Sequence, residues 1–434
     1  MPNNPCINVW KTPNLPADWF KRKPDCAKDN DEIEANVRNI ISQVRLKGDT
    51  ALFEFTEKFD RAKLSEKTLR VTQKEIEASY GNVKQEQIAA LKLMKDRLAS
   101  REKLVLQQIQ MKTSYEDINV QTVLRPIESV GCYVPGGRAV YPSTVIMTTL
   151  PAKMARVKRV VVCSPPTAQG TINPLILVAA DLCGVDEIYR IGGAQAIAAM
   201  AYGTQAIKAV KKIVGPGSAY VTMAKILVSK DVAIDMPAGP SEVLVLADER
   251  GDPRMVAADM ISQAEHGADS VAGLITTSTK FAQSVVAALE ELVVSTERAE
   301  TVQAALSTYG FIIVCQTVAE MVELANVFAP EHLEIITQDA QKIAEKITSA
   351  GVILLGPYSP VALSDYASGT NHVLPTAGFG HSFSGLSVLD FMRRVNIVES
   401  TKDGLQKVKD SIKVLTAAEN LPNHYLAVEA RFKE

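Results

Sequence analysis

The chain has 434 residues, of which 47% are hydrophobic and 22% are charged, a balance typical of folded globular proteins that excludes a mainly disordered chain. The length predicts about three domains with at least two hydrophobic cores. The 47 Lys and Arg residues nearly cancel the 49 Asp and Glu residues, and no apolar run approaches the roughly 18 residues of a membrane span, so neither a nucleic-acid-binding nor a membrane protein is expected.

The six cysteines stand singly along the chain, at positions 6, 26, 132, 163, 183 and 315. None forms a C-x-x-C pair, so neither a thiolate zinc site nor a redox dithiol is expected. Cys163 and Cys315 lie in apolar, strand-like runs and are expected in the core. Free thiols, together with a start that lacks the basic and apolar regions of a secretory signal, predict a cytoplasmic protein.

The first hundred residues have the apolar spacing of helices, which we expect over 31–59 and 73–104. From about residue 120, short β-branched runs alternate with Ala-rich helical segments. Strands are expected at 159–163, 187–191 and 212–214, and the helices that follow them at 174–182, 194–202 and 220–229. Such alternation favours βαβ units around a parallel sheet.

A second alternating set follows, with strands expected at 242–247, 270–276, 311–315, 333–337 and 351–355. Helices are expected over 279–307 and in the stretch that ends at Phe328. The tail from Thr401 predicts two helices separated at 420–422. The sequence therefore predicts an α/β fold with two sheet domains of similar kind.

Histidine gives the sharpest indication of a functional site, because all five lie in the second half of the chain, at positions 266, 332, 372, 381 and 424. A helix is expected over 252–266, and Asp259, Gln263 and His266 are spaced so that they share one face of it. That face is either the solvated side of the helix or part of a metal site.

Two further segments carry ionisable groups. Glu331 and His332 are adjacent at an expected helix-to-strand corner and would suit acid–base chemistry, although a dipeptide alone is weak evidence. The stretch SDYASGTNHVLPT at 364–376 is dense in small, hydroxyl and ionisable residues, which make a poor helix or strand. It is either a functional loop or a loop that hydrogen-bonds to itself.

Three glycine-rich stretches, at 131–137, 192–195 and 215–218, each stand between an expected strand and an expected helix. Loops of this kind, ending at a helix N-terminus, are able to bind phosphate or pyrophosphate. None contains G-x-G-x-x-G, so the motif alone does not separate a dinucleotide site from the ordinary turns of a βαβ protein.

Taken together, these segments resemble the histidinol dehydrogenase family from about residue 30 to the end. The resemblance is carried by SVGCYVPGG at 129–137, IGGAQAI at 191–197, DMPAGPSE at 235–242, SQAEHG at 262–267, PEH at 330–332 and DYASGTNHVLPT at 365–376. It implies an α/β fold of two similar incomplete Rossmann-like domains with parallel sheets, plus small N-terminal and C-terminal helical pieces. It also implies an intertwined homodimer.

The resemblance divides the chain into four parts. These are an N-terminal arm at 1–27, a first Rossmann-like domain from 28–132 and 241–385, a second from 133–240, and a swapped C-terminal helical domain at 386–434. The first domain is expected to carry the zinc and acid–base residues. The second is expected to carry the loops that bind NAD.

The family oxidises L-histidinol through L-histidinal to L-histidine, the last step of histidine biosynthesis, with two NAD molecules and one zinc per subunit. The resemblance implies zinc ligands at Gln263, His266, Asp365 and His424 of the partner subunit. It assigns the acid–base pair to Glu331 and His332. The implied substrate contacts are Ser241, Gln263, His266, Glu331, His332, Asp365, His372, Glu419 and His424.

The implied NAD contacts are Tyr133, Gln195 and Ser218. Ser218 departs from the family, which usually has Asn there, in the string GPGN. Two other enzymes remain open: a related zinc and NAD dehydrogenase for another small polar alcohol, and a zinc-dependent hydrolase with Glu331 as base. The hydrolase, like a non-enzymatic zinc or nucleotide-binding protein, would leave part of these motifs without a role.

Overall fold

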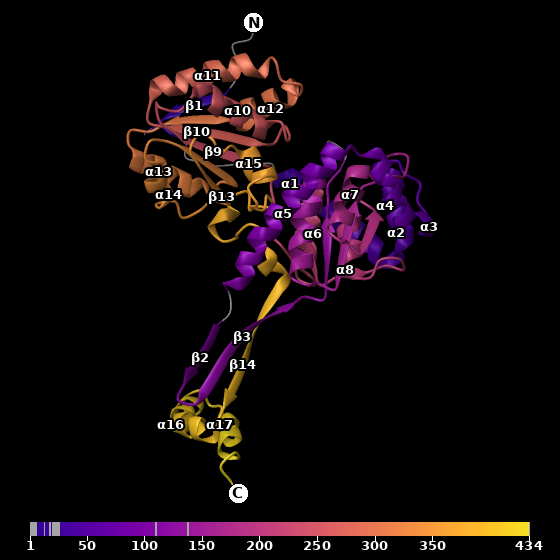
Figure 1. The fold of residues 1–434 in the computed structure, drawn as a ribbon, viewed down its shortest axis with the longest axis vertical. Coiled ribbons are helices and arrows are strands. Elements are labelled where there is room, and N and C mark those ends of the chain that lie inside the picture. Colours follow the sequence, from indigo (N-terminus) through magenta and orange to yellow (C-terminus); the bar gives the residue numbers. More distant parts are fainter. Residues whose placement is uncertain are drawn as a thin grey trace.

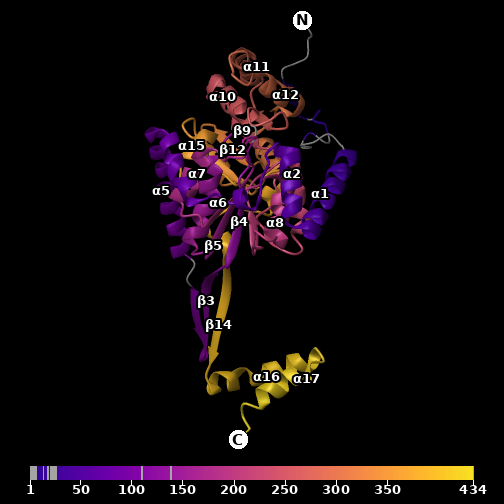
Figure 2. The same cartoon turned by 90° about the vertical axis from the view of Figure 1, so that its right-hand side faces the viewer.

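The computed structural model describes residues 7–12, 14–16, 19, 27–108, 111–136 and 139–433. Most of the expected N-terminal arm at 1–27 and the glycine at 137 therefore lie outside the described residues. Two α/β domains form the body of the molecule, and a long arm projects from it (Figures 1 and 2). The expected fold class, two parallel-sheet domains with helical end pieces, is confirmed.

One domain is built on a six-stranded sheet in the order β1-β11-β10-β9-β12-β13, in which every pairing is parallel. Its strands are β1 (Asn8–Lys11), β9 (Glu242–Ala247), β10 (Val271–Thr276), β11 (Phe311–Val314), β12 (His332–Ile336) and β13 (Val352–Leu355). The central strands are apolar on both faces because helices cover both.

The helices of this domain fall into two layers. The layer of α10 (Pro253–Ala264), α11 (Thr279–Val293) and α12 (Ala299–Tyr309) packs on the face that includes Val243 and Val245. The layer of α13 (Val318–Phe328) and α14 (Ala340–Ala344) packs on the face of Leu244 and Leu246. Each layer encloses its own buried apolar core, as the sequence predicts.

The other domain has a five-stranded parallel sheet in the order β6-β5-β4-β7-β8. Its strands are β4 (Ser129–Tyr133), β5 (Arg159–Ser164), β6 (Glu187–Arg190), β7 (Lys212–Val214) and β8 (Ala233–Ile234). Its own crossover helices are α6 (Pro142–Met154), α7 (Pro174–Leu182), α8 (Gly193–Tyr202) and α9 (Ala219–Val228). Cys163 in this sheet and Cys315 in the other are buried and free, as expected.

The N-terminal helices complete this second domain. They are α1 (Ala27–Lys47), α2 (Asp49–Asp60), α3 (Glu66–Leu69), α4 (Gln73–Ser79) and α5 (Gln85–Gln107). Helix α1 packs on α8 and α9, and α5 packs on α6. The apolar faces of α1 and α5 are buried in the cores of the five-stranded sheet. The packing of these helices therefore differs from the expected domain division, which joined 28–132 to 241–385.

The two long helices expected near the N-terminus are each interrupted. The segment 31–59 divides into α1 and α2 at Gly48, whose φ of 58° is left-handed and cannot continue a helix. The segment 73–104 divides into α4 and α5 around a short 3-10 turn at Tyr80–Asn82. From residue 159 to the sheet edge at 355, the expected strands and helices are confirmed, with small shifts at their ends.

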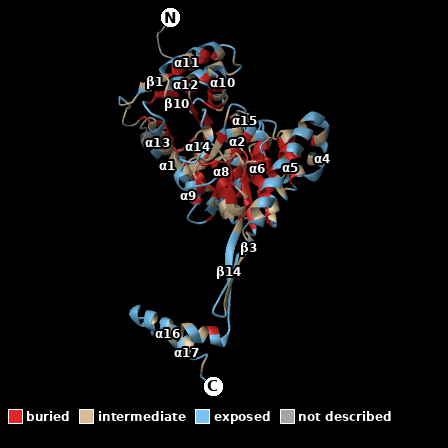
Figure 3. Ribbon diagram, turned by 60° about the vertical axis from the view of Figure 1, so that its left-hand side comes forward, coloured by how far each residue is buried: buried red, intermediate tan, exposed pale blue. Residues whose placement is uncertain are grey.

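The arm consists of an antiparallel sheet followed by two helices. Its strands are β2 (Met111–Tyr115), β3 (Ile118–Pro126) and β14 (Met392–Ser400), and its helices are α16 (Lys402–Ala418) and α17 (Pro422–Glu429). The two tail helices and their break were predicted, whereas the sheet was not. The arm is largely exposed in Figure 3, and its apolar side chains include Val398, Leu415 and Leu426, each more than half exposed.

In the described part of the chain, no helix is both long enough and apolar enough to cross a bilayer.

Candidate active site

Glu331 and His332 lie at the amino-terminal edge of the six-stranded sheet, where β12 begins beside the start of β9. The backbone N–H of Glu242 donates to Glu331 Oε2 at 2.8 Å. His332 Nδ1 lies 3.1 Å from the carbonyl oxygen of Glu242. A carbonyl oxygen only accepts, so Nδ1 carries the hydrogen in the neutral ring and Nε2 is left able to accept a proton.

Asp365 faces the other nitrogen of this histidine. Its Oδ1 lies 3.2 Å from His332 Nε2. Burial opposes protonation of His332, but the carboxylates of Glu331 and Asp365 outweigh it and hold the pKa of the imidazole well above its ordinary value. Burial also raises the pKa of Asp365, but its hydrogen bond and attraction to His332 outweigh that effect and leave the pKa low. The three residues form one compact acid–base cluster.

Asp365 belongs to α15 (Val361–Tyr366), so the expectation that 364–376 is entirely loop is wrong at its start. The backbone N–H of Val361, which has no partner within the first turn of this helix, donates to the buried carboxyl group of Glu334 at 2.8 Å. The stretch after Tyr366 is irregular, as expected, and brings His372 back so that its Nδ1 lies 3.1 Å from the carbonyl oxygen of Asp365. Burial lowers the pKa of His372.

Gln263 and His266 approach the same edge from α10. The helix ends at Ala264, so His266 lies in the turn beyond it rather than on the helix face that the spacing predicted. The turn is closed by a hydrogen bond from the backbone N–H of His266 to the carbonyl oxygen of Gln263 at 3.2 Å. Asp259, one turn earlier, hydrogen-bonds to Glu334 instead, and burial beside Asp259 raises the pKa of Glu334 to about 9.

Gln263, His266 and Asp365 of one subunit are compatible with part of a metal site. Gln263 is 2% exposed, and its Oε1 has no hydrogen-bond partner, which is costly for a buried amide oxygen unless a ligand completes it. His266 is close enough to lower the pKa of Asp365. Among the residues described, no three His, Cys, Asp or Glu side chains gather closely enough to hold a metal ion.

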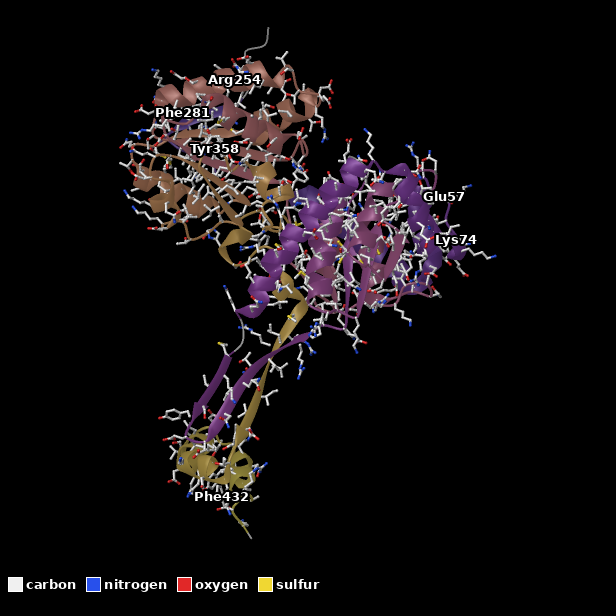
Figure 4. All side chains as sticks on the ribbon, viewed as in Figure 1. Glu57, Lys74, Arg254, Phe281, Tyr358 and Phe432 are labelled. Carbon is white, nitrogen blue, oxygen red and sulfur yellow. The ribbon has the colours of Figure 1, made fainter. Side chains whose placement is uncertain are left out.

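The remaining expected ligand, His424, lies on α17 at the end of the arm, and Glu419 precedes it at the end of α16. Figure 1 shows α16 and α17 at the end of the arm, and Figure 4 shows Phe432, near this end, on the far side of the molecule from Arg254 in the six-stranded domain. One chain therefore does not bring Glu419 or His424 to the other site residues. Ser241, in contrast, immediately precedes β9 at the site edge.

The expected cofactor contacts lie at the carboxyl-terminal edge of the five-stranded sheet. Tyr133 ends β4, and its hydroxyl accepts a hydrogen bond from the N–H of Gly193 at 3.1 Å. Gln195 is buried in the first turn of α8, and its Oε1 has no hydrogen-bond partner. Ser218 is the N-cap of α9, but its side chain makes no capping bond. Two helix N-termini with unused polar groups suit a phosphate-containing ligand.

A cavity of about 560 Å³ lies beside this site, with His266 in its lining. Helix α5, the loop before α6, the turn after α10 and the end of α15 all contribute to its lining, which includes Leu91, Met94, Tyr141, His266 and Tyr366. Sequence reasoning missed Glu242, whose backbone contacts both members of the acid–base pair. The sequence does carry one signal for Glu242, because it is a charged residue at the first position of the otherwise apolar strand EVLVLA.

An acid–base cluster on one α/β domain and two helix N-termini with unused polar groups on the other are typical of a two-domain α/β enzyme. Residues 24–432 match the family model described as histidinol dehydrogenase. The chain belongs to the histidinol dehydrogenase family and is therefore an oxidoreductase.

Relatives and a solved structure agree with this assignment. The chain is 44% identical to a histidinol dehydrogenase of Clostridium acetobutylicum, with 94% of each chain covered. It is also 44% identical to one of Vibrio parahaemolyticus, with 93% of this chain and 92% of the relative covered. The crystal structure of histidinol dehydrogenase from Elizabethkingia anophelis, at 38% identity, superposes with a TM-score of 0.93 and covers 98% of each chain.

Proposed function

We propose that the protein oxidises L-histidinol to L-histidine through L-histidinal, with two NAD molecules and one zinc per subunit. The observation that carries this proposal is the environment of His332. Its Nδ1 is tied to the Glu242 carbonyl oxygen, and its Nε2 points to Asp365, so the ring has one fixed nitrogen and one able to exchange a proton. Family membership supplies the substrate class.

In the first oxidation, the neutral form of His332 accepts the hydroxyl proton at Nε2, a transfer that its raised pKa favours, while the carbon-bound hydrogen leaves as hydride, giving the aldehyde. In the second, Glu331 accepts a proton from water as the water oxygen attacks the aldehyde carbon, and His332 returns the proton it took in the first step to the aldehyde oxygen, giving the hydrate. The neutral His332 then takes a proton from a hydrate hydroxyl, and a second hydride leaves to give the carboxylic acid. NAD supplies the hydride acceptor in both steps. Tyr133, Gln195 and Ser218 are the proposed cofactor contacts.

Gln263, His266 and Asp365 would hold zinc together with His424 of the partner subunit. The donor set of one amide oxygen, one carboxylate and two imidazoles suits zinc, and the partnerless Gln263 Oε1 supports it. When bound, zinc supplies a fixed point that orients the substrate. Ser241, His372 and Glu419 are the remaining proposed substrate contacts.

A homodimer follows from the same arrangement, because the tail ligand is held away from its own site. The uncovered apolar side chains of the arm would be buried against a second copy. We also propose a cytoplasmic location, which the free, buried state of the four described cysteines supports.

The direct test is NADH formation from histidinol, with and without a chelator. We expect two NADH per histidinol, activity lost on chelation and regained with zinc. Turnover of another alcohol but not of histidinol would favour a related dehydrogenase, and turnover without NAD would favour a hydrolase. His266→Ala should lose its zinc by elemental analysis, whereas the exposed His381→Ala should retain it; full zinc in the first variant would contradict the ligand set.

A further inference from the structure

A buried ion pair holds the first residue of the glycine loop 215–218. Lys225 Nζ donates to the carbonyl oxygen of Gly215 at 2.9 Å, and Asp235 Oδ2 accepts from the N–H of Gly215 at 2.7 Å. The two side chains also pair with each other, and they are 2% and 1% exposed. Both backbone polar groups of Gly215 are therefore fixed by charged side chains.

The loop has little freedom on its other side. Gly215 has a φ of 118°, and a Cβ built on it would lie 2.1 Å from the carbonyl oxygen of Tyr133. Only glycine fits there. The loop is thus held between the end of β4 and the ion pair, and it leads directly to Ser218 at the start of α9.

Asp235 also begins the segment 235–242, which crosses from the five-stranded to the six-stranded sheet. Its backbone N–H donates to the carbonyl oxygen of Ile213 at 3.2 Å. Further along, Thr222 Oγ1 donates to the carbonyl oxygen of Ala238 at 2.8 Å, and Gly239 N–H donates to Thr376 Oγ1. The segment is therefore fastened to both domains.

At its far end the same segment reaches the acid–base pair. Glu242 donates its N–H to Glu331 and accepts from His332 through its carbonyl oxygen. Its side chain accepts from the N–H of Ala377 at 2.9 Å. One short piece of chain thus contacts the glycine loop at one end and both members of the acid–base pair at the other.

We propose that Lys225, Asp235 and the segment 235–242 form a positioning strap that sets the cofactor loop relative to Glu331 and His332. The inference rests on the proposed function and names residues that act through others rather than on the substrate. Hydride transfer requires the reacting atoms to approach within about 3–3.5 Å. The cofactor loop of one domain must therefore be held at a fixed position relative to the acid–base pair of the other. Replacing both members of a buried ion pair is often neutral for stability, which separates a positioning role from a merely structural one.

The test compares Asp235→Asn and the double variant Lys225→Met/Asp235→Asn with the wild type. The double variant removes both charges yet keeps an oxygen that can accept from Gly215. We expect the dissociation constant of NADH, measured by fluorescence without histidinol, and the KM for NAD to rise by about tenfold or more. We expect kcat to fall, and the KM for histidinol to stay within about twofold.

The matched control is the Arg159–Glu187 ion pair of the same sheet, in which Arg159 Nη2 lies 2.9 Å from Glu187 Oε2 on the adjacent strand. Arg159→Met/Glu187→Gln should leave NADH affinity and kcat at wild-type values, whatever its Tm. Thr222→Val removes only the mid-strap hydroxyl bond and is the variant to use where the ion-pair variants do not fold; a severalfold loss of NADH affinity is expected.

Folded strap variants with wild-type NADH affinity and kcat would overturn the inference, as would the same loss of affinity in the control pair. Unchanged affinity in Thr222→Val, when the ion-pair variants do not fold, would also overturn it. Failure of the proposed function looks different. In that case the wild type forms no NADH from histidinol, while the binding comparison between the variants still holds.

Discussion

At the scale of single residues, hydrogen bonds to the backbone fix the orientation of the Glu331 and His332 side chains. The Glu242 backbone occupies one nitrogen of His332 and one oxygen of Glu331, and so aims the other atoms of both groups. The two side chains are adjacent in sequence but have different neighbours, because only His332 contacts Asp365. Different neighbours allow different roles in the two oxidations.

Glu331→Gln should therefore slow histidinal oxidation more than histidinol oxidation. An amide oxygen is still able to accept from the Glu242 N–H, so the position is kept while the base is lost. His332→Asn should slow both steps, since each needs proton removal, by on the order of 10²- to 10⁴-fold. Rates of NADH formation starting from each substrate measure this. Equal losses in both steps for the Glu331 variant would remove its separate role.

A second prediction at this scale concerns the effect of Ser218 on NAD binding. Its side chain makes no capping bond at the start of α9, and Asn is also a favourable N-cap, so Ser218→Asn should not harm the helix. A hydrogen bond is worth roughly 0.5–1.5 kcal/mol, so the KM for NAD should fall by at most about tenfold. The KM for histidinol should stay nearly constant. With Ser218→Ala as control, no change in NAD dependence for either variant would show that this position makes no contact with the cofactor.

At the scale of elements, the sequence was informative where an element has a buried face. The apolar strand β9 and the crossover helix α7 were predicted within the body because both faces of a strand, or one stripe of a helix, must be apolar there. The strands of the arm were missed. Strand β14 is exposed along almost its whole length and so carries no burial pattern to read.

The site was only partly predictable for a related reason. The sequence indicated Gln263, His266, Glu331, His332 and Asp365 as residues of interest, and the structure gathers them at one edge of the sheet. The sequence did not indicate that they gather at the amino-terminal edge, because that edge is formed by the pairing of β12 with β9, which lies far away in the sequence. Glu242 contacts the acid–base pair through its backbone, which leaves little trace in side-chain chemistry.

The break between α1 and α2 gives a prediction for an element. A Cβ on Gly48 would lie 2.1 Å from Gln205 Oε1, the atom that accepts from the N–H of Asp49, and the φ of 58° disfavours any L side chain. Gly48→Ala should lower the free energy of unfolding by about 1–2 kcal/mol or more. Gly81→Ala, with open space around it, should change it by less than about 0.5 kcal/mol. Equal denaturation midpoints for the two variants would contradict this reasoning.

At the scale of the whole molecule, the chain is divided between a body that carries Gln263, His266 and Asp365 and an arm that holds His424, the fourth proposed zinc ligand, far from them. Glu419 ends α16, Asn420 turns the chain with a φ of 56°, and Pro422 opens α17. Glu419 and His424 thus straddle a turn, which is able to present both to one site, as a single continuous helix would not. We propose that the arm presents them to the site of a second copy.

Complementation between inactive variants tests this exchange. His424→Ala and His266→Ala should each be inactive alone and should regain activity when unfolded, mixed and refolded together. In a heterodimer, one site receives an intact body from the first chain and an intact tail from the second, while the other site lacks both histidines. Random pairing makes about half of the molecules heterodimers with one working site each, so about a quarter of wild-type activity is the ceiling. If heterodimers confirmed by mass show no recovery, each site is built from one chain and the arm is not exchanged.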